Sequence, residues 1–148
     1  MNTGKIITSD REIKEILENT KTIAVLGLSP KTERDSYKVG AYLKEKGYQI
    51  IPVRPGQKEI LGEKAVKTLD DIEESRKPVD IVDAFRNSEQ IPGHIPEALR
   101  LRPKVFWMQL GIENEKAAAQ LTSAGIDVIM NRCIKIEYEK LFRKKIIV

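Results

Sequence analysis

The chain has 148 residues, of which 41% are hydrophobic and 32% charged, so it fits one compact domain with a real core and leaves no room for a second catalytic lobe. The formal net charge is +4, but lysine and glutamate are interleaved along the chain, which argues against a nucleic-acid partner. No run of 18 apolar residues predicts a membrane span, the first residues lack a secretory apolar segment, and the single cysteine cannot form an internal disulfide, so we expect a cytoplasmic protein with no membrane partner.

The first predicted element is a helix over residues 11–18. Ser9 can cap its N-terminus, and the apolar residues at 13, 16 and 17 fall on one helical face. We expect the segment 1–20, which contains this helix, to pack on a domain that spans 21–148.

A strand, a helix and a second strand follow. The apolar run 23–26 predicts a buried strand, and the residues 36–46 predict a helix that its first residue, a serine, can cap. Gly47 stands where a left-handed C-terminal cap belongs. The run 48–53 predicts the second strand, with Pro52 near its carboxyl end because proline cannot donate a ladder hydrogen bond.

The rest of the chain continues the alternation of strands and helices. A glycine-flanked loop over 56–62 holds a short extended piece at 60–61. The further elements, in chain order, are a short helix over 68–74, a strand over 79–85, a helix over 92–101, a strand over 105–108, an alanine-rich helix over 114–124, a strand over 128–130 and a helix over 134–142. This order predicts an α/β fold of one domain, with a mainly parallel five-stranded sheet between two layers of helices.

The residues just after each predicted strand are the candidate ligand-binding residues, because open parallel sheets bind ligands beyond the carboxyl ends of their strands. The first strand is followed by one glycine and by hydroxyls and cations suited to an anion: Gly27, Ser29, Lys31, Arg34 and Ser36. Each of them also has a plain structural reading, as a turn glycine, a helix cap or a solvated charge. Their concentration at one sheet edge favours a phosphate site.

The residues at the end of the second predicted strand indicate which nucleotide the site suits. A NAD site would have two more glycines in the first loop and an acidic residue after the second strand. Here the second strand ends in Pro52-Val53-Arg54-Pro55. An apolar ledge with an arginine suits an adenine beside a phosphorylated ribose, as in NADP or coenzyme A, although Arg54 can also be a surface cation.

Candidate catalytic and metal-binding residues are few. His94 is the one histidine and lies beside no serine or cysteine motif, so a helix-start or surface role is favoured. Cys133 is read as a small buried apolar residue, and one histidine with one distant cysteine makes no metal site. Trp107 is expected in the core, whereas Gln109, Leu110 and Gly111 just beyond it can face the ligand. Asn87, after the third strand, is expected at the same edge of the sheet.

Several segments together resemble a known family. They are residues 24–31 with Arg34, 36–37 and Val39, then 51–53, 82–86, 107–111 and 131–137. In these segments the chain is similar to the small stand-alone CoA-binding proteins of bacteria and archaea, relatives of the nucleotide-binding N-terminal domain of the succinyl-CoA synthetase α subunit. The likeness spans about residues 21–141.

The resemblance implies a Rossmann-like CoA-binding fold and a set of ligand-binding residues: Gly27, Leu28, Ser29, Lys31, Arg34, Ser36, Val53, Arg54, Pro55, Phe85 and Arg86. The first loop would meet phosphates, the second strand's end would flank the adenosine, and Phe85 with Arg86 would border the pantetheine path. The chain departs from its relatives at Arg54, where they usually have asparagine, and at Asp35, where they often have proline. The first change can strengthen a site through the 3′-phosphate of CoA, and the second can weaken it.

Three functions remain open from the sequence. The favoured one is a non-catalytic CoA or acyl-CoA binding protein, since the phosphohistidine of the synthetase lies in a domain that this chain lacks. The alternatives are an NADP-dependent oxidoreductase or redox sensor, for which His94 or Tyr37 would donate a proton, and an interaction domain that has lost its ligand. A protein partner or a homo-oligomer is expected, and the apolar end 146–148 is expected in the core or against another subunit.

Overall fold

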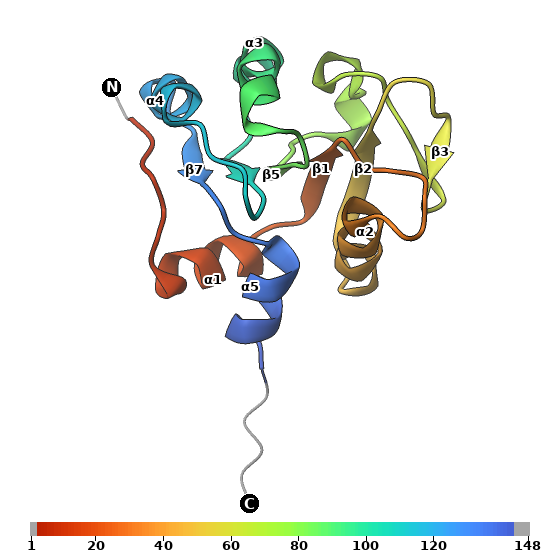
Figure 1. Ribbon diagram of the computed structural model, residues 1–148, viewed down its shortest axis with the longest axis horizontal. Coiled ribbons are helices and arrows are strands. Elements are labelled where there is room, and N and C mark those ends of the chain that lie inside the picture. Colours follow the sequence, from red (N-terminus) through yellow and green to blue (C-terminus); the bar gives the residue numbers. More distant parts are fainter. Residues whose placement is uncertain (1–2, 144–148) are drawn as a thin grey trace, which may run out of the picture.

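A five-stranded, wholly parallel sheet forms the centre of the computed structural model, which describes residues 3–143 (Figure 1). The strand order is β2-β1-β5-β6-β7. The strands are β1 (Thr22–Leu26), β2 (Gln49–Val53), β5 (Ile81–Ala84), β6 (Val105–Met108) and β7 (Asp127–Ile129). Because every neighbouring pair is parallel, all the carboxyl ends meet at one edge of the sheet.

Helices cover both faces of this sheet, as the alternation of elements predicted. The helices are α1 (Asp10–Glu18), α2 (Asp35–Glu45), α3 (Ile91–Leu101), α4 (Glu115–Ser123) and α5 (Ile134–Leu141). Apolar residues of α3 and α4 share one core cluster with one face of the sheet, and those of α1, α2 and α5 share a second cluster with the other face. The predicted three-layer α/β/α architecture is confirmed.

The strands are buried on both faces, which explains their uninterrupted apolar sequences. In β1, Ala24 and Leu26 belong to the cluster under α3 and α4, whereas Ile23 and Val25 belong to the opposite cluster. This alternation follows from the two-residue period of a strand. The N-terminal helix α1 joins the second cluster through Ile13 and Leu17, and Ser9 caps it by accepting the N–H of Glu12 at 3.2 Å.

The connection between β2 and β5 differs most from the prediction. Instead of one helix over 68–74, two 3₁₀ turns form, η1 (Leu69–Asp71) and η2 (Glu74–Arg76). Between them Ile72 has an extended backbone and is buried in the core together with Leu69. The three-residue spacing of Leu69 and Ile72 fits a 3₁₀ turn as well as a helix, and the two 3₁₀ turns bury both side chains in the core. The extended piece at 60–61 is a small antiparallel pair, β3 (Glu59–Ile60) with β4 (Glu63–Lys64).

Other boundaries lie within a few residues of the predictions. The third 3₁₀ turn, η3 (Ser88–Gln90), leads directly into α3. Pro92 lies in the first turn of α3, but Pro96 lies inside the helix rather than in an early turn. The prediction for residues 146–148 falls outside the described residues. Among residues 3–143, no helix has the length and apolar character needed to cross a membrane.

Candidate anion-binding site

A cleft of about 910 Å³ lies at the carboxyl edge of the sheet. The loops that follow β1, β2, β5 and β6 form its walls. The lining residues are Gly27, Ser29, Lys31, Arg34, Asp35, Ser36, Arg54, Phe85, Arg86, Asn87, Ser88, Glu89, Leu110, Gly111 and Ile112. The cleft therefore lies where ligands bind in open parallel sheets.

Gly27 makes the turn out of β1, and the turn requires a glycine. Its φ is +87°, and a Cβ atom there would lie 2.6 Å from the carbonyl oxygen of Phe85. The turn is held on both sides, because the Gly27 N–H donates to the carbonyl of Val53 at 2.9 Å and the Phe85 N–H donates to that of Leu26 at 2.9 Å. The first loop is therefore fixed between the ends of β2 and β5.

The two serines of the first loop organise its backbone. The N–H of Ser29 donates to the hydroxyl of Ser36 at 2.9 Å, and the N–H of Lys31 donates to the hydroxyl of Ser29 at 3.1 Å. The prediction that Ser36 caps α2 is wrong, because the helix begins at Asp35 and Arg34 is the N-cap residue. Each hydroxyl accepts a backbone N–H, so its own hydrogen remains for donation to an anion.

The N-terminus of α2 opens into the cleft. Arg34 provides no side-chain cap, so its side chain leaves the first N–H groups of the helix for other acceptors. Asp35, the first helical residue, is exposed and lines the same cleft. An uncapped helix N-terminus favours an anion, whereas the Asp35 carboxylate competes for the same N–H groups.

The charge of the cleft is mainly positive. Its cations are Lys31, Arg34, Arg54 and Arg86, and its acids are Asp35 and Glu89. Within residues 3–143, none of these cations forms an ion pair with a carboxylate; the ion pairs lie elsewhere. Unpaired cations around one cleft attract an anion of several charges.

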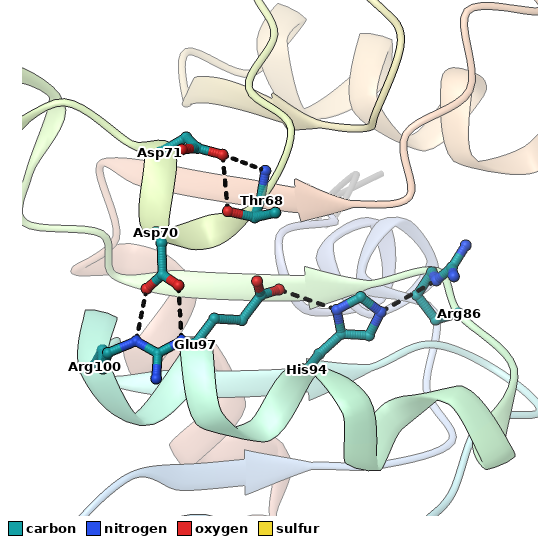
Figure 2. A network of polar contacts seen from close by, with 7 residues as sticks. All are labelled: Thr68, Asp70, Asp71, Arg86, His94, Glu97 and Arg100. Atoms are coloured by element: carbon teal, nitrogen blue, oxygen red, sulfur yellow. Dashed lines mark hydrogen bonds and ion pairs between the residues drawn. The ribbon is translucent and has the colours of Figure 1, made fainter.

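His94 lies behind the cleft and contacts one of these cations (Figure 2). The Nε atom of Arg86 donates to Nε2 of His94 at 3.3 Å, and Nδ1 of His94 lies 3.0 Å from Oε1 of Glu97. The prediction of a helix-start role is correct for its place in the first turns of α3, but these partners were not foreseen. Cys133 is half-buried at the N-cap of α5, packed against the core and outside the cleft lining.

Most of the predicted ligand-binding residues line the cleft, but Leu28, Val53 and Pro55 do not. Leu28 and Val53 are core residues with 0% and 1% exposure. Val53 ends β2, where the strand's alternation turns its side chain into the cluster under α3 and α4. Pro55 is exposed beyond Arg54.

Gln109 does not line the cleft, contrary to the prediction that it can face a ligand. It is buried, with Nε2 donating to Oδ2 of Asp83 at 3.3 Å and Oε1 accepting the N–H of Ile134 at 3.1 Å. Burial raises the pKa of the Asp83 carboxyl well above its ordinary value, and the hydrogen bond from Gln109 opposes this only in part. The expected core position of Trp107 is confirmed, and Gly111 lines the cleft.

Asn87 and Leu110 line the cleft as their place after a strand predicts, but sequence reasoning missed three of their neighbours: Ser88, Glu89 and Ile112. They obey the same carboxyl-edge rule as the predicted residues. The only signal of the three missed residues is their position, since a serine or a glutamate in a loop carries no motif. Leu110 is 63% exposed and, with Ile112 and Phe85, gives the cleft an apolar side.

Comparison with known families agrees with this geometry. Residues 21–139 match the family model of the CoA binding domain. The chain belongs to this family. The family resemblance predicted from the sequence segments is thereby confirmed.

A curated sequence and several solved structures are similar to this chain. The uncharacterized protein YneT of Bacillus subtilis (strain 168) is 47% identical over 130 residues, which cover 88% of this chain and 94% of YneT. The solved structure of cell-free ID.343 from Thermus thermophilus has a TM-score of 0.86 and 41% identity, covering 91% of this chain and 100% of that one. An acetyl-coenzyme A synthetase 1 from Ca. Korarchaeum cryptofilum matches 77% of this chain with 26% of its own, at 21% identity and a TM-score of 0.66, which shows the fold alone.

Proposed function

We propose that this protein binds coenzyme A or an acyl-CoA in the cleft, with the ADP part over the first loop, and catalyses no reaction on it. The observation that carries the proposal is the gathering of Lys31, Arg34, Arg54 and Arg86, unpaired by carboxylates among residues 3–143, around the uncapped N-terminus of α2. CoA has a diphosphate and a 3′-phosphate, so its charge matches such a cleft. Membership of the CoA binding domain family supports the same ligand.

The two ends of the cleft suit the two ends of CoA. Arg54 follows β2 at the edge of the sheet, and we assign it to the 3′-phosphate of the adenosine. Phe85, Leu110 and Ile112 give the opposite wall apolar surface, which suits the pantetheine arm. The exposed position of Leu110 leaves room for the thiol end, free or acylated, to reach solvent or a protein partner.

The non-catalytic part of the proposal rests on the chemistry of the lining. His94 and Cys133, which sequence reasoning considered for catalysis, are not among the described residues that line the cleft. Nε2 of His94 already accepts from Arg86, which removes it as a free base. We infer that a cytoplasmic protein of this kind senses CoA or presents it to a partner or a second copy of itself.

Calorimetric titration with CoA and with 3′-dephospho-CoA tests the ligand and its orientation. Saturable CoA binding is expected, weaker for dephospho-CoA, and Arg54→Ala should cost about 1.5 to 3 kcal/mol for CoA but little for dephospho-CoA. Arg11→Ala, which removes an arginine of α1 whose side chain is 89% exposed and outside the cleft, is the charge-matched control. Binding of NADPH in the absence of any CoA binding would contradict the proposal.

A further inference from the structure

A chain of three polar side chains links the cleft to one face of α3. Arg86 lines the cleft just after β5, while His94 and Glu97 lie three residues apart on α3 and so point the same way (Figure 2). The Arg86 Nε atom lies 3.3 Å from His94 Nε2, and His94 Nδ1 lies 3.0 Å from Glu97 Oε1. The side chains of His94 and Glu97 are only 22% and 12% exposed.

These contacts determine the tautomer of His94. The Nε–H of a guanidinium can only donate, so Nε2 of the imidazole must present its lone pair to Arg86. The Glu97 carboxylate can only accept, so Nδ1 must carry the hydrogen. The network therefore places the lone pair of His94 on Nε2 and the hydrogen on Nδ1.

The network engages only one nitrogen of the Arg86 guanidinium, Nε. A Cβ atom at Gly27 would lie 3.1 Å from Cδ of Arg86, which shows that the stem of Arg86 runs along the turn after β1. His94 engages Nε, and the two terminal nitrogens, with four N–H groups, remain for the cleft. A guanidinium held at Nε presents those nitrogens in a fixed plane, which suits bidentate binding of a phosphate.

The helix that provides His94 and Glu97 is itself tied to the rest of the fold. One turn after Glu97, Arg100 makes two hydrogen bonds to Asp70 of η1, at 2.9 and 2.7 Å. Thr68 and Asp71 close the same 3₁₀ turn with hydrogen bonds of 3.1 and 2.8 Å (Figure 2). The acceptor for Arg86 is therefore held in place through α3.

We propose that His94 and Glu97 are positioning residues, which hold the Arg86 guanidinium for a phosphate group of the CoA ligand. The inference rests on the proposed function and adds a specific role for residues that do not touch the ligand. Glu97 orients the ring, the ring accepts from Arg86, and Arg86 meets the phosphate. Because His94 already holds the Arg86 side chain, that side chain loses little conformational entropy when the ligand binds.

A double-mutant cycle measured by CoA titration tests the role. His94→Phe removes the acceptor and should weaken CoA binding about fivefold, but should change nothing further in an Arg86→Ala background. His94→Gln can place an amide oxygen near the position of Nε2 and should restore most of the affinity. Glu97→Leu should weaken binding, whereas Glu97→Gln keeps an acceptor for Nδ1–H and should bind like the parent protein.

A ligand-free measurement tests the geometry independently. His94 is the only histidine of the chain, so its ring nitrogens give unambiguous ¹⁵N resonances. The proposal expects the Nδ1–H tautomer in the unmodified protein, and an Nε2–H tautomer would overturn it.

The outcomes separate the two proposals. CoA binding that is unchanged in His94→Phe, or that loses equal affinity with and without Arg86, would overturn the positioning role alone. Absence of CoA binding in the unmodified protein would overturn the proposed function and the positioning role together.

Discussion

The N–H of Ser29 and the hydroxyl of Ser36 form a buried 2.9 Å hydrogen bond that fastens the first loop to the first turn of α2. The bond brings the loop backbone, the two serine hydroxyls and the helix N-terminus to one side of the cleft. It also explains why Ser36 lies within the helix rather than at its cap. A capping hydroxyl would satisfy the helix's own N–H groups, whereas this one satisfies the loop.

Ser36→Ala should therefore destabilise the protein and weaken CoA binding. The buried N–H of Ser29 would lose its partner, at a cost of about 1 to 3 kcal/mol in the free energy of unfolding. Urea denaturation measures the first effect and calorimetry the second. Ser123→Ala, at the exposed end of α4, is the matched control and should change neither. Unchanged stability of Ser36→Ala would mean that water replaces the hydroxyl.

Gly27→Ala should lower the free energy of unfolding much more than the same change at another glycine with a similar φ. Gly27 and Gly56 have φ values of +87° and +82°, but only at Gly27 would the new Cβ meet a carbonyl oxygen at 2.6 Å. Left-handed strain alone predicts a loss of about 1 kcal/mol for Gly56→Ala. The added clash predicts about 2 kcal/mol or more for Gly27→Ala, with loss of CoA binding. Equal losses of stability in the two variants would contradict the role of the Phe85 carbonyl.

Asp35→Pro should strengthen CoA binding. Proline is favoured at the first helical position, and Arg34 before it has φ −77° and ψ 144°, which a residue preceding proline can adopt. The change removes the one acidic side chain in the first turn of α2, so affinity should rise about two- to fivefold. Asp35→Asn removes the charge without stiffening the backbone and separates the two contributions. Weaker binding by both variants would show that the carboxylate serves the ligand.

Asp83→Asn should change how stability depends on pH. Burial raises the pKa of Asp83 in the folded protein, so the folded chain holds a proton that the unfolded chain releases above its ordinary pKa of about 3.9. The unmodified protein should then lose up to about 1.4 kcal/mol of stability per pH unit as pH rises from there to the raised pKa, and no more beyond it. Asp83→Asn lacks this slope and should become the more stable protein at high pH.

Urea denaturation of both proteins at several pH values checks this prediction. The expected result is that the free energy of unfolding of the unmodified protein falls relative to that of Asp83→Asn as pH rises. A constant difference would show that Asp83 stays ionised, with a partner for its Oδ1 atom, which has none among the described residues.

The local sequence carried most of the information about the fold. Apolar runs such as 105–108 match a strand residue for residue, because a strand buried on both faces needs an unbroken apolar sequence. The prediction over 68–74 was wrong because the spacing of Leu69 and Ile72 suits a helix and a pair of 3₁₀ turns alike. Packing against the core decided between them.

For the site, the carboxyl-edge rule predicts from the sequence alone that Gly27, Lys31, Arg54 and Arg86 lie together, and all four line the cleft. Side-chain direction could not be obtained in the same way. Val53 and Gln109 lie next to lining residues in the sequence, yet both point into the core.

The sequence by itself determined the family, the order of the elements and the residues at the carboxyl edge of the sheet, because these depend on local patterns and on where parallel strands end. Only the tertiary structure decided the partners of those residues. The contacts of Ser29 with Ser36 and of Arg86 with His94 depend on how a loop and two helices dock on the sheet. Hydrogen bonds need agreement within a few tenths of an ångström, and only the packed chain sets positions that finely.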